Sequence, residues 1–181
     1  MTCIDILWEE YKSTYSCLLQ HNELSLASDY ANIMRKVLLL SCGSFFEAEL
    51  TKQLKEYCKT ASNGNSRLES FIVKQALNQK YHTLFDWGEI GDPTRPHKNI
   101  NKFSSLFGKE FKDKIEMFQK NDESVAESIK AFLEIGHIRN ILVHSNFAEY
   151  TYAQKTPEDI YLLYTKALRF PKFIYNQLLA S

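Results

Sequence analysis

The sequence lacks a cysteine pattern typical of a metal site, because its four cysteines are widely spread. They stand at Cys3, Cys17, Cys42 and Cys58, with no Cys-x2-Cys pair and no neighbouring cluster of histidines. Structural zinc sites need four such ligands at short, characteristic spacings. The pattern therefore argues against a zinc site and favours free thiols in a reducing compartment.

Long apolar runs are also missing. No uninterrupted apolar stretch approaches the roughly 20 residues that span a bilayer, and residues 1–10 contain no basic region followed by an apolar segment. We therefore expect a cytoplasmic protein that has no membrane partner.

The sequence has no excess of either charge and none of the common enzyme motifs. Its 22 basic and 22 acidic residues give a formal net charge of zero, so any contact with nucleic acid must be local. It contains no glycine-rich phosphate loop, no His-Glu-x2-His pair and no Gly-x-Ser-x-Gly turn. We therefore expect no cofactor and no resident metal.

What the sequence does contain is helical periodicity along most of its length. Apolar residues recur at three- and four-residue intervals, and no segment alternates as a β-strand would. We expect an all-α, up-and-down bundle of about five to six helices, forming a single domain over residues 1–181. The expected helices cover residues 4–21, 26–59, 67–81, 103–118, about 121–146, and 156–179 with a kink at Pro171.

The helical pattern fails over residues 84–101, and a connection of this length is usually functional or mobile. In one interpretation, the aromatic residues Phe85 and Trp87 stack on bases while Arg95, His97 and Lys98 contact phosphate. In the other, Trp87 packs inward and anchors the long connection.

Four polar residues gather near the end of the expected helix over residues 121–146. His137, Asn140 and His144 are separated by three and four residues, so they share one stripe of a helix, and Arg139 stands beside it. The positions between them are apolar, so these polar groups need partners or a cavity. An imidazole exchanges protons near neutral pH, and a guanidinium presents a fork of donors to phosphate oxygens.

Two less specific interpretations apply to the same residues. Arg139 and His144 would also satisfy buried polar groups near a helix end, where cations suit the helix dipole. A metal bridge between His137 and His144, two turns apart, is geometrically allowed but lacks an evident third ligand.

Glu47 is the candidate partner for the arginine. It lies close to the stripe of Ile33, Leu40 and Ser44 on the long expected helix, so it points into the bundle unless it faces a cleft. Buried carboxylates rarely go unpaired, which predicts an ion pair with Arg139 or another cation. Such a pair is compatible with a purely structural role and with orienting the arginine for chemistry.

The segment Arg139-Asn-Ile-Leu-Val-His144 resembles the Arg-x4-6-His motif of HEPN domains, including the polar residue after the arginine. A Phe-Phe-Glu segment ending at Glu47 on a long earlier helix, and an aromatic-rich last helix, resemble those domains too. The order of elements is most similar to the RiboL-PSP-HEPN and MAE-type branches, over about residues 25–178.

The resemblance implies a metal-independent RNA endonuclease of the kind found in prokaryotic toxin–antitoxin and antiphage-defence loci. It implies that Arg139, Asn140 and His144 are catalytic, that Glu47 and His137 support them, and that RNA is the substrate. It also implies a homodimer in which both copies of the motif line one cleft, with a cognate antitoxin protein as a further partner.

Two alternatives accompany that expectation. The first is a monomer in which His137 supplies the second imidazole, as the shared stripe permits. The second is a non-catalytic helical module that binds a partner protein or RNA, because some HEPN domains have lost nuclease activity.

Overall fold

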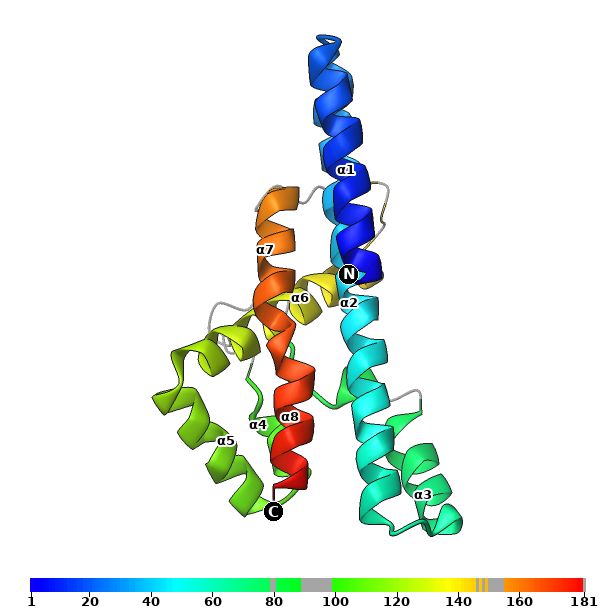
Figure 1. Ribbon diagram of the computed structural model, residues 1–181, viewed down its shortest axis with the longest axis vertical. Coiled ribbons are helices and arrows are strands. Elements are labelled where there is room, and N and C mark those ends of the chain that lie inside the picture. Colours follow the sequence, from blue (N-terminus) through cyan, green and yellow to red (C-terminus); the bar gives the residue numbers. More distant parts are fainter. Residues whose placement is uncertain (79–80, 89–98, 146, 148, 150–154, 181) are drawn as a thin grey trace.

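The computed structural model describes residues 1–78, 81–88, 99–145, 147, 149 and 155–180, and its fold is all-α as expected (Figure 1). Within these ranges the extended pairing is limited to an isolated bridge between Asp86 and Asn99. None of the helices in the described residues is both long enough and apolar enough to cross a membrane.

Helices α1 (Cys3–Gln20) and α2 (Leu24–Ala61) form an antiparallel hairpin that projects from one end of the molecule (Figure 1). A capping box begins α1: the Thr2 hydroxyl accepts from the Asp5 N–H, and the Asp5 carboxylate accepts from the Thr2 N–H. The base of the hairpin is held to α7 (Pro157–Ala167) by Trp8, whose ring stacks on Tyr161 at 4.7 Å.

The middle of the chain is less regular than the sequence predicts. The expected helix over residues 67–81 is α-helical only in α3 (Ser66–Ile72), continues as a π-helix (Val73–Leu77), and is followed by a 3₁₀ turn (Tyr81–Thr83). The expected helix over 103–118 is two helices, α4 (Asn101–Ser105) and α5 (Lys109–Asn121). Gly108 separates them with a φ of +95°, a backbone conformation that a helix cannot continue through.

The last two expected helices lie close to their predicted positions. Helix α6 (Glu123–His144) is capped by Asp122, and α7 by Thr156 with Pro157 in its first turn. The kink predicted at Pro171 is a break at Leu168, after which α8 (Arg169–Leu179) begins. Proline has no N–H to donate to the Ala167 carbonyl four residues earlier, so the chain changes direction there. Because of these breaks, the described residues form more helices than the five to six expected.

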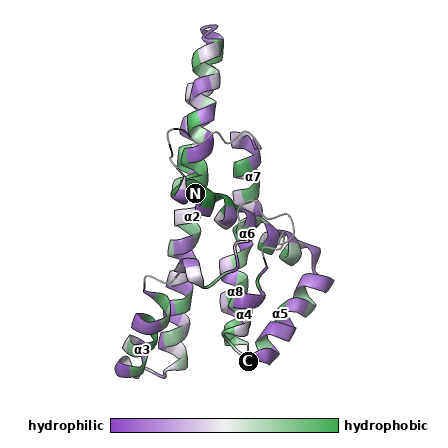
Figure 2. Ribbon diagram, turned by 180° about the vertical axis from the view of Figure 1, so that it is seen from behind, coloured by the Kyte–Doolittle hydropathy of each residue, from purple (hydrophilic) through white to green (hydrophobic). Residues whose placement is uncertain are grey.

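Helix α6 lies at the centre of the molecule and contacts α2, α5, α7 and α8. The Phe132 ring of α6 lies 4.2 Å from Phe170 of α8 and 5.8 Å from Phe46 of α2, and all three side chains are buried. By contrast, the visible face of α5 is mostly hydrophilic (Figure 2). The aromatic core therefore holds the motif helix rigidly, with its C-terminal end left at the surface.

Candidate functional site

Arg139 occupies the crossing between α6 and α2, at the position of Gly43. A Cβ on Gly43 would come within 2.6 Å of Arg139 Cγ, so only glycine allows the aliphatic part of the arginine to rest on α2. One turn further along α2, Glu47 Oε2 accepts from Arg139 Nη2 at 3.3 Å. The expected ion pair is therefore present.

The Glu47–Arg139 pair is partly exposed, with side-chain exposures of 40% and 27%. Glu47 therefore faces a surface groove and does not point into the bundle. A single contact of this length in a solvated setting contributes at most about 1 kcal/mol to folding. Its main physical effect is to hold the guanidinium in one place and one orientation.

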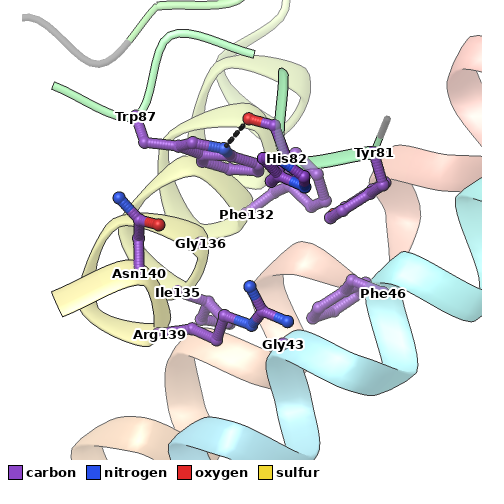
Figure 3. A pocket seen from close by; sticks show the side chains of 10 residues that line it. All are labelled: Gly43, Phe46, Tyr81, His82, Trp87, Phe132, Ile135, Gly136, Arg139 and Asn140. Atoms are coloured by element: carbon purple, nitrogen blue, oxygen red, sulfur yellow. Dashed lines mark hydrogen bonds between the residues drawn. The ribbon is translucent and has the colours of Figure 1, made fainter. Parts of the chain in front are cut away.

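A very small cavity lies on the other side of Arg139 (Figure 3). Its volume is about 10 Å³, the space of one water molecule and far too little for a nucleotide. Residues of three segments line it: Gly43, Phe46, Tyr81, His82, Trp87, Phe132, Ile135, Gly136, Arg139 and Asn140. A substrate must therefore reach Arg139 from the outer surface of the helices.

Tyr81 is the buried titratable group of this cavity. The pKa of the Tyr81 phenol is raised far above its ordinary value, mainly by burial and further by the nearby Glu47 carboxylate. The phenol therefore stays protonated throughout the physiological pH range and cannot act as a base.

Trp87 anchors the connection between α3 and α4 on the motif helix. Its indole lies against Gly136, where a Cβ would come within 2.0 Å of ring atom Cζ3. The indole N–H donates to the His82 carbonyl at 2.9 Å (Figure 3), and the His137 ring nitrogen Nδ1 lies 2.6 Å from the Trp87 carbonyl. The prediction that Trp87 packs inward is confirmed.

This anchoring also decides where His137 points. Because the carbonyl oxygen of Trp87 can only accept, the 2.6 Å contact requires a proton on His137 Nδ1. His137 thus faces the loop and supports it, which weighs against a second catalytic imidazole within one chain. The loop residues Arg95, His97 and Lys98 lie outside the described part of the chain.

Asn140 and His144 lie on the part of α6 that approaches the surface. Asn140 is half-buried beside Trp87, on a different side of α6 from Arg139 (Figure 3). His144 is the last residue of α6 and is exposed, and the chain turns extended at Ser145. His144 is five positions after Arg139, which places the two residues about 7.5 Å apart along the helix axis and about 140° apart around it.

The site offers a guanidinium held by a carboxylate, a carboxamide and two imidazoles. The described residues contain no group of three or more His, Cys, Asp or Glu arranged to hold a metal ion. Sequence reasoning missed two contributors, Gly136 and Tyr81. A glycine inside an otherwise apolar helix, directly before His137, was an available signal for close packing. Nothing local to Tyr81 indicates that it lines this cavity.

Comparison with protein families gives a match that covers nearly the whole chain. The RiboL-PSP-HEPN family model matches residues 9–180, a range that includes α2, α6 and every site residue described above. Comparison with curated proteins and with solved structures gives no significant match. The all-α fold is in keeping with the family match. The chain belongs to the RiboL-PSP-HEPN family.

Proposed function

We propose that this protein is a metal-independent RNA endonuclease whose site is built from Arg139, Asn140 and His144. The proposal rests on the positions of the Arg139 and His144 side chains on α6. The Arg139 guanidinium is held partly exposed by Glu47, and His144 stands exposed at the free end of α6. A fixed cation and an accessible imidazole are the groups that RNA cleavage without a metal requires.

The chemistry is a transesterification within the RNA strand. The ribose 2′-hydroxyl loses its proton to a base and attacks the adjacent phosphorus, which breaks the bond to the 5′-oxygen of the next nucleotide. That oxygen takes a proton from an acid, and the products are a 2′,3′-cyclic phosphate and a free 5′-hydroxyl. An imidazole can serve as base or acid, while Arg139 stabilises the charge that develops on the phosphate oxygens.

The geometry of α6 favours a site made by two chains. Within one helix, Arg139 and His144 point in directions about 140° apart, so they converge poorly on one phosphate. Two proton-handling groups on opposite sides of the phosphate are also needed, and one chain exposes a single motif histidine there. A two-fold axis near the end of α6 supplies the second copy of both residues.

Exposed apolar side chains surround the end of α6, as such an interface would require. Val143, next to His144, is 51% exposed, and Phe147 beyond the helix end is 39% exposed. Phe147 is held against α2, because its carbonyl accepts from Lys36 Nζ at 2.7 Å. A contact between two copies centred on Val143 would bury this surface and bring the two His144 side chains close together.

The test is cleavage of total RNA in the presence of EDTA, with analysis of the product ends. We expect cleavage products that carry 2′,3′-cyclic phosphates, and no cleavage by soluble His144→Ala or Arg139→Ala protein. His21→Ala and Arg67→Ala, which change exposed residues away from α6, are matched controls that should cleave normally. Undiminished EDTA-resistant cleavage by His144→Ala protein would refute the assignment.

A second candidate is a helical module that binds a protein or RNA without cutting it. The observation that favours it is that Arg139 already has a partner in Glu47 and that His144 suits a helix C-terminus. Expression in cells separates the two functions. An active nuclease toxin should arrest growth unless a cognate antitoxin protein is supplied, and a non-catalytic module should be tolerated.

A further inference from the structure

An open groove runs along α2 and begins beside the candidate site, with Glu69 of α3 also lining it. One face of α2 lines it, with Ser44, Glu47, Thr51, Lys52, Lys55 and Lys59 recurring at helical intervals. Its volume is about 640 Å³, in contrast to the cavity of about 10 Å³ behind Arg139. We call this the lysine groove.

The three lysines of the groove form no ion pair with any other described residue. Lys52, Lys55 and Lys59 are exposed, and none of them lies within 4.0 Å of a carboxylate in the described part of the chain. Lysines on other helices do pair, such as Lys12 with Glu9 and Lys166 with Glu127. The groove therefore presents a row of three free ammonium groups on one side of one helix.

Three carboxylates line the groove as well. Glu47 pairs with Arg139, whereas Glu56 and Glu69 line the groove and form no ion pair with another described residue. These carboxylates reduce the overall attraction of the groove for anions. A phosphate must therefore lie close to a lysine to bind there. No aromatic side chain is among the lining residues, so the groove has no platform on which bases could stack.

The groove and the candidate site share one residue. Glu47 lines the groove and also holds the Arg139 guanidinium, so a phosphate on Arg139 would lie at the mouth of the groove. From Ser44 to Lys59, α2 extends for about 22 Å away from α6, and its last turns run beside α3 (Figure 1). A strand that passes Arg139 therefore has a continuous path over the lysines.

We propose that the lysine groove binds the sugar–phosphate backbone of single-stranded RNA next to the scissile phosphate. The proposal rests on the nuclease function proposed above. A single row of cations on one helix fits one strand, whereas recognition of duplex RNA spans two grooves of the helix. Contacts to phosphate alone position the RNA and read no base sequence, so the groove makes binding tolerant of sequence.

The experiment measures binding without cleavage. The probe is a 2′-O-methyl oligouridine, which has no 2′-hydroxyl to attack, and its affinity is measured from 50 to 200 mM salt. Each phosphate contact that is lost lowers the slope of log affinity against log salt by about 0.7 for a single strand. The triple variant Lys52→Gln, Lys55→Gln, Lys59→Gln should therefore have a slope that is smaller by about 2. Between 50 and 200 mM salt, the affinity of the wild-type protein should then fall roughly 20-fold more than that of the variant.

Two further triple variants serve as controls. Lys109→Gln, Lys120→Gln and Lys172→Gln remove the same charge from exposed positions on α5 and α8 and should leave the slope unchanged. Replacement of the three groove lysines by arginine should preserve the slope, because the charges remain. Glutamine has nearly the helix propensity of lysine, so the groove variant is expected to fold.

The outcomes separate this proposal from the nuclease proposal. An unchanged slope in the groove variant, an equal change in the control variant, or no binding by the wild-type protein overturns the lysine groove. None of these results depends on cleavage. A protein that binds with the predicted slope but does not cut RNA overturns only the nuclease assignment.

Discussion

Replacement of Gly136 by alanine tests the packing of Trp87 on α6, which anchors the connection between α3 and α4. In the structure a Cβ at this position would lie 2.0 Å from Trp87 Cζ3, 2.4 Å from Cε3 and 2.6 Å from Cη2. Ordinary van der Waals contact begins near 3.4 Å, so the rigid ring must move by at least 3.4 − 2.0 = 1.4 Å. Such a shift is too large for a well-packed core to absorb without loss of contacts.

The size of the effect follows from two opposing contributions. Loss of the Trp87 packing costs about 3–5 kcal/mol, as for truncation of a large aromatic side chain. Alanine in a helix interior is favoured over glycine by about 1 kcal/mol. We therefore expect Gly136→Ala to lower the free energy of unfolding by about 2–4 kcal/mol, and Tm by roughly 4–16 °C for a chain of this size.

The assay is thermal and urea unfolding followed by far-UV circular dichroism, in the wild-type and Trp87→Ala backgrounds. Without the indole, the alanine Cβ has room, so Gly136→Ala should raise the unfolding free energy of the Trp87→Ala protein by about 1 kcal/mol. The sign of the effect should therefore reverse between the two backgrounds. Stabilisation of the wild-type protein, or equal destabilisation in both backgrounds, would refute the contact.

Two further predictions follow from the charges around α6. Glu47→Gln should change the unfolding free energy by less than about 1 kcal/mol, because the ion pair is partly exposed. It should nevertheless reduce RNA cleavage, because the Arg139 guanidinium is no longer held in place. The control Glu10→Gln on α1 should change neither stability nor cleavage. Losses of stability and of cleavage in proportion would contradict an orienting role. Backbone N–H groups at the start of α6, chiefly that of Val125, lower the pKa of Asp122 below its ordinary value of 3.8. The stabilisation by Asp122 is therefore complete above about pH 3.8 and is lost as the pH falls through the lowered pKa. Asp122→Asn keeps a capping side chain without the charge, so its urea midpoint should fall less steeply with acid than that of the wild-type protein. Identical slopes would contradict this assignment.

The helices could be predicted because their signals are local. Apolar periodicity and cap residues set α1, α6 and the start of α7 to within one or two residues. The breaks at Gly108 and Leu168 were harder to predict from the sequence, because the amphipathic spacing of apolar residues continues across both. A glycine at positive φ and a proline without a donor decide these places, and their effect on the chain depends on the packing around them.

The candidate site was predictable where a residue type alone demands a partner. A carboxylate on a half-buried stripe and an arginine in an apolar helix pointed to the Glu47–Arg139 pair, although 92 residues separate them. The engagement of His137 by the Trp87 carbonyl was not predictable, because helical spacing specifies a shared stripe but not which neighbour covers it. The groove beside Glu47 likewise depends on where α3 folds back on α2.

The most direct measurement concerns a dimer with one altered chain. Wild-type and His144→Ala chains that carry different tags are co-expressed, and the mixed dimer is purified on both tags. The RNA cleavage rate of the mixed dimer in EDTA is then compared with the rates of the wild-type and doubly altered dimers. If two copies of the motif form one site, the mixed dimer should be nearly as inactive as the doubly altered one. A mixed dimer with half of the wild-type rate, a monomeric active species, or an inactive wild-type protein would contradict the account.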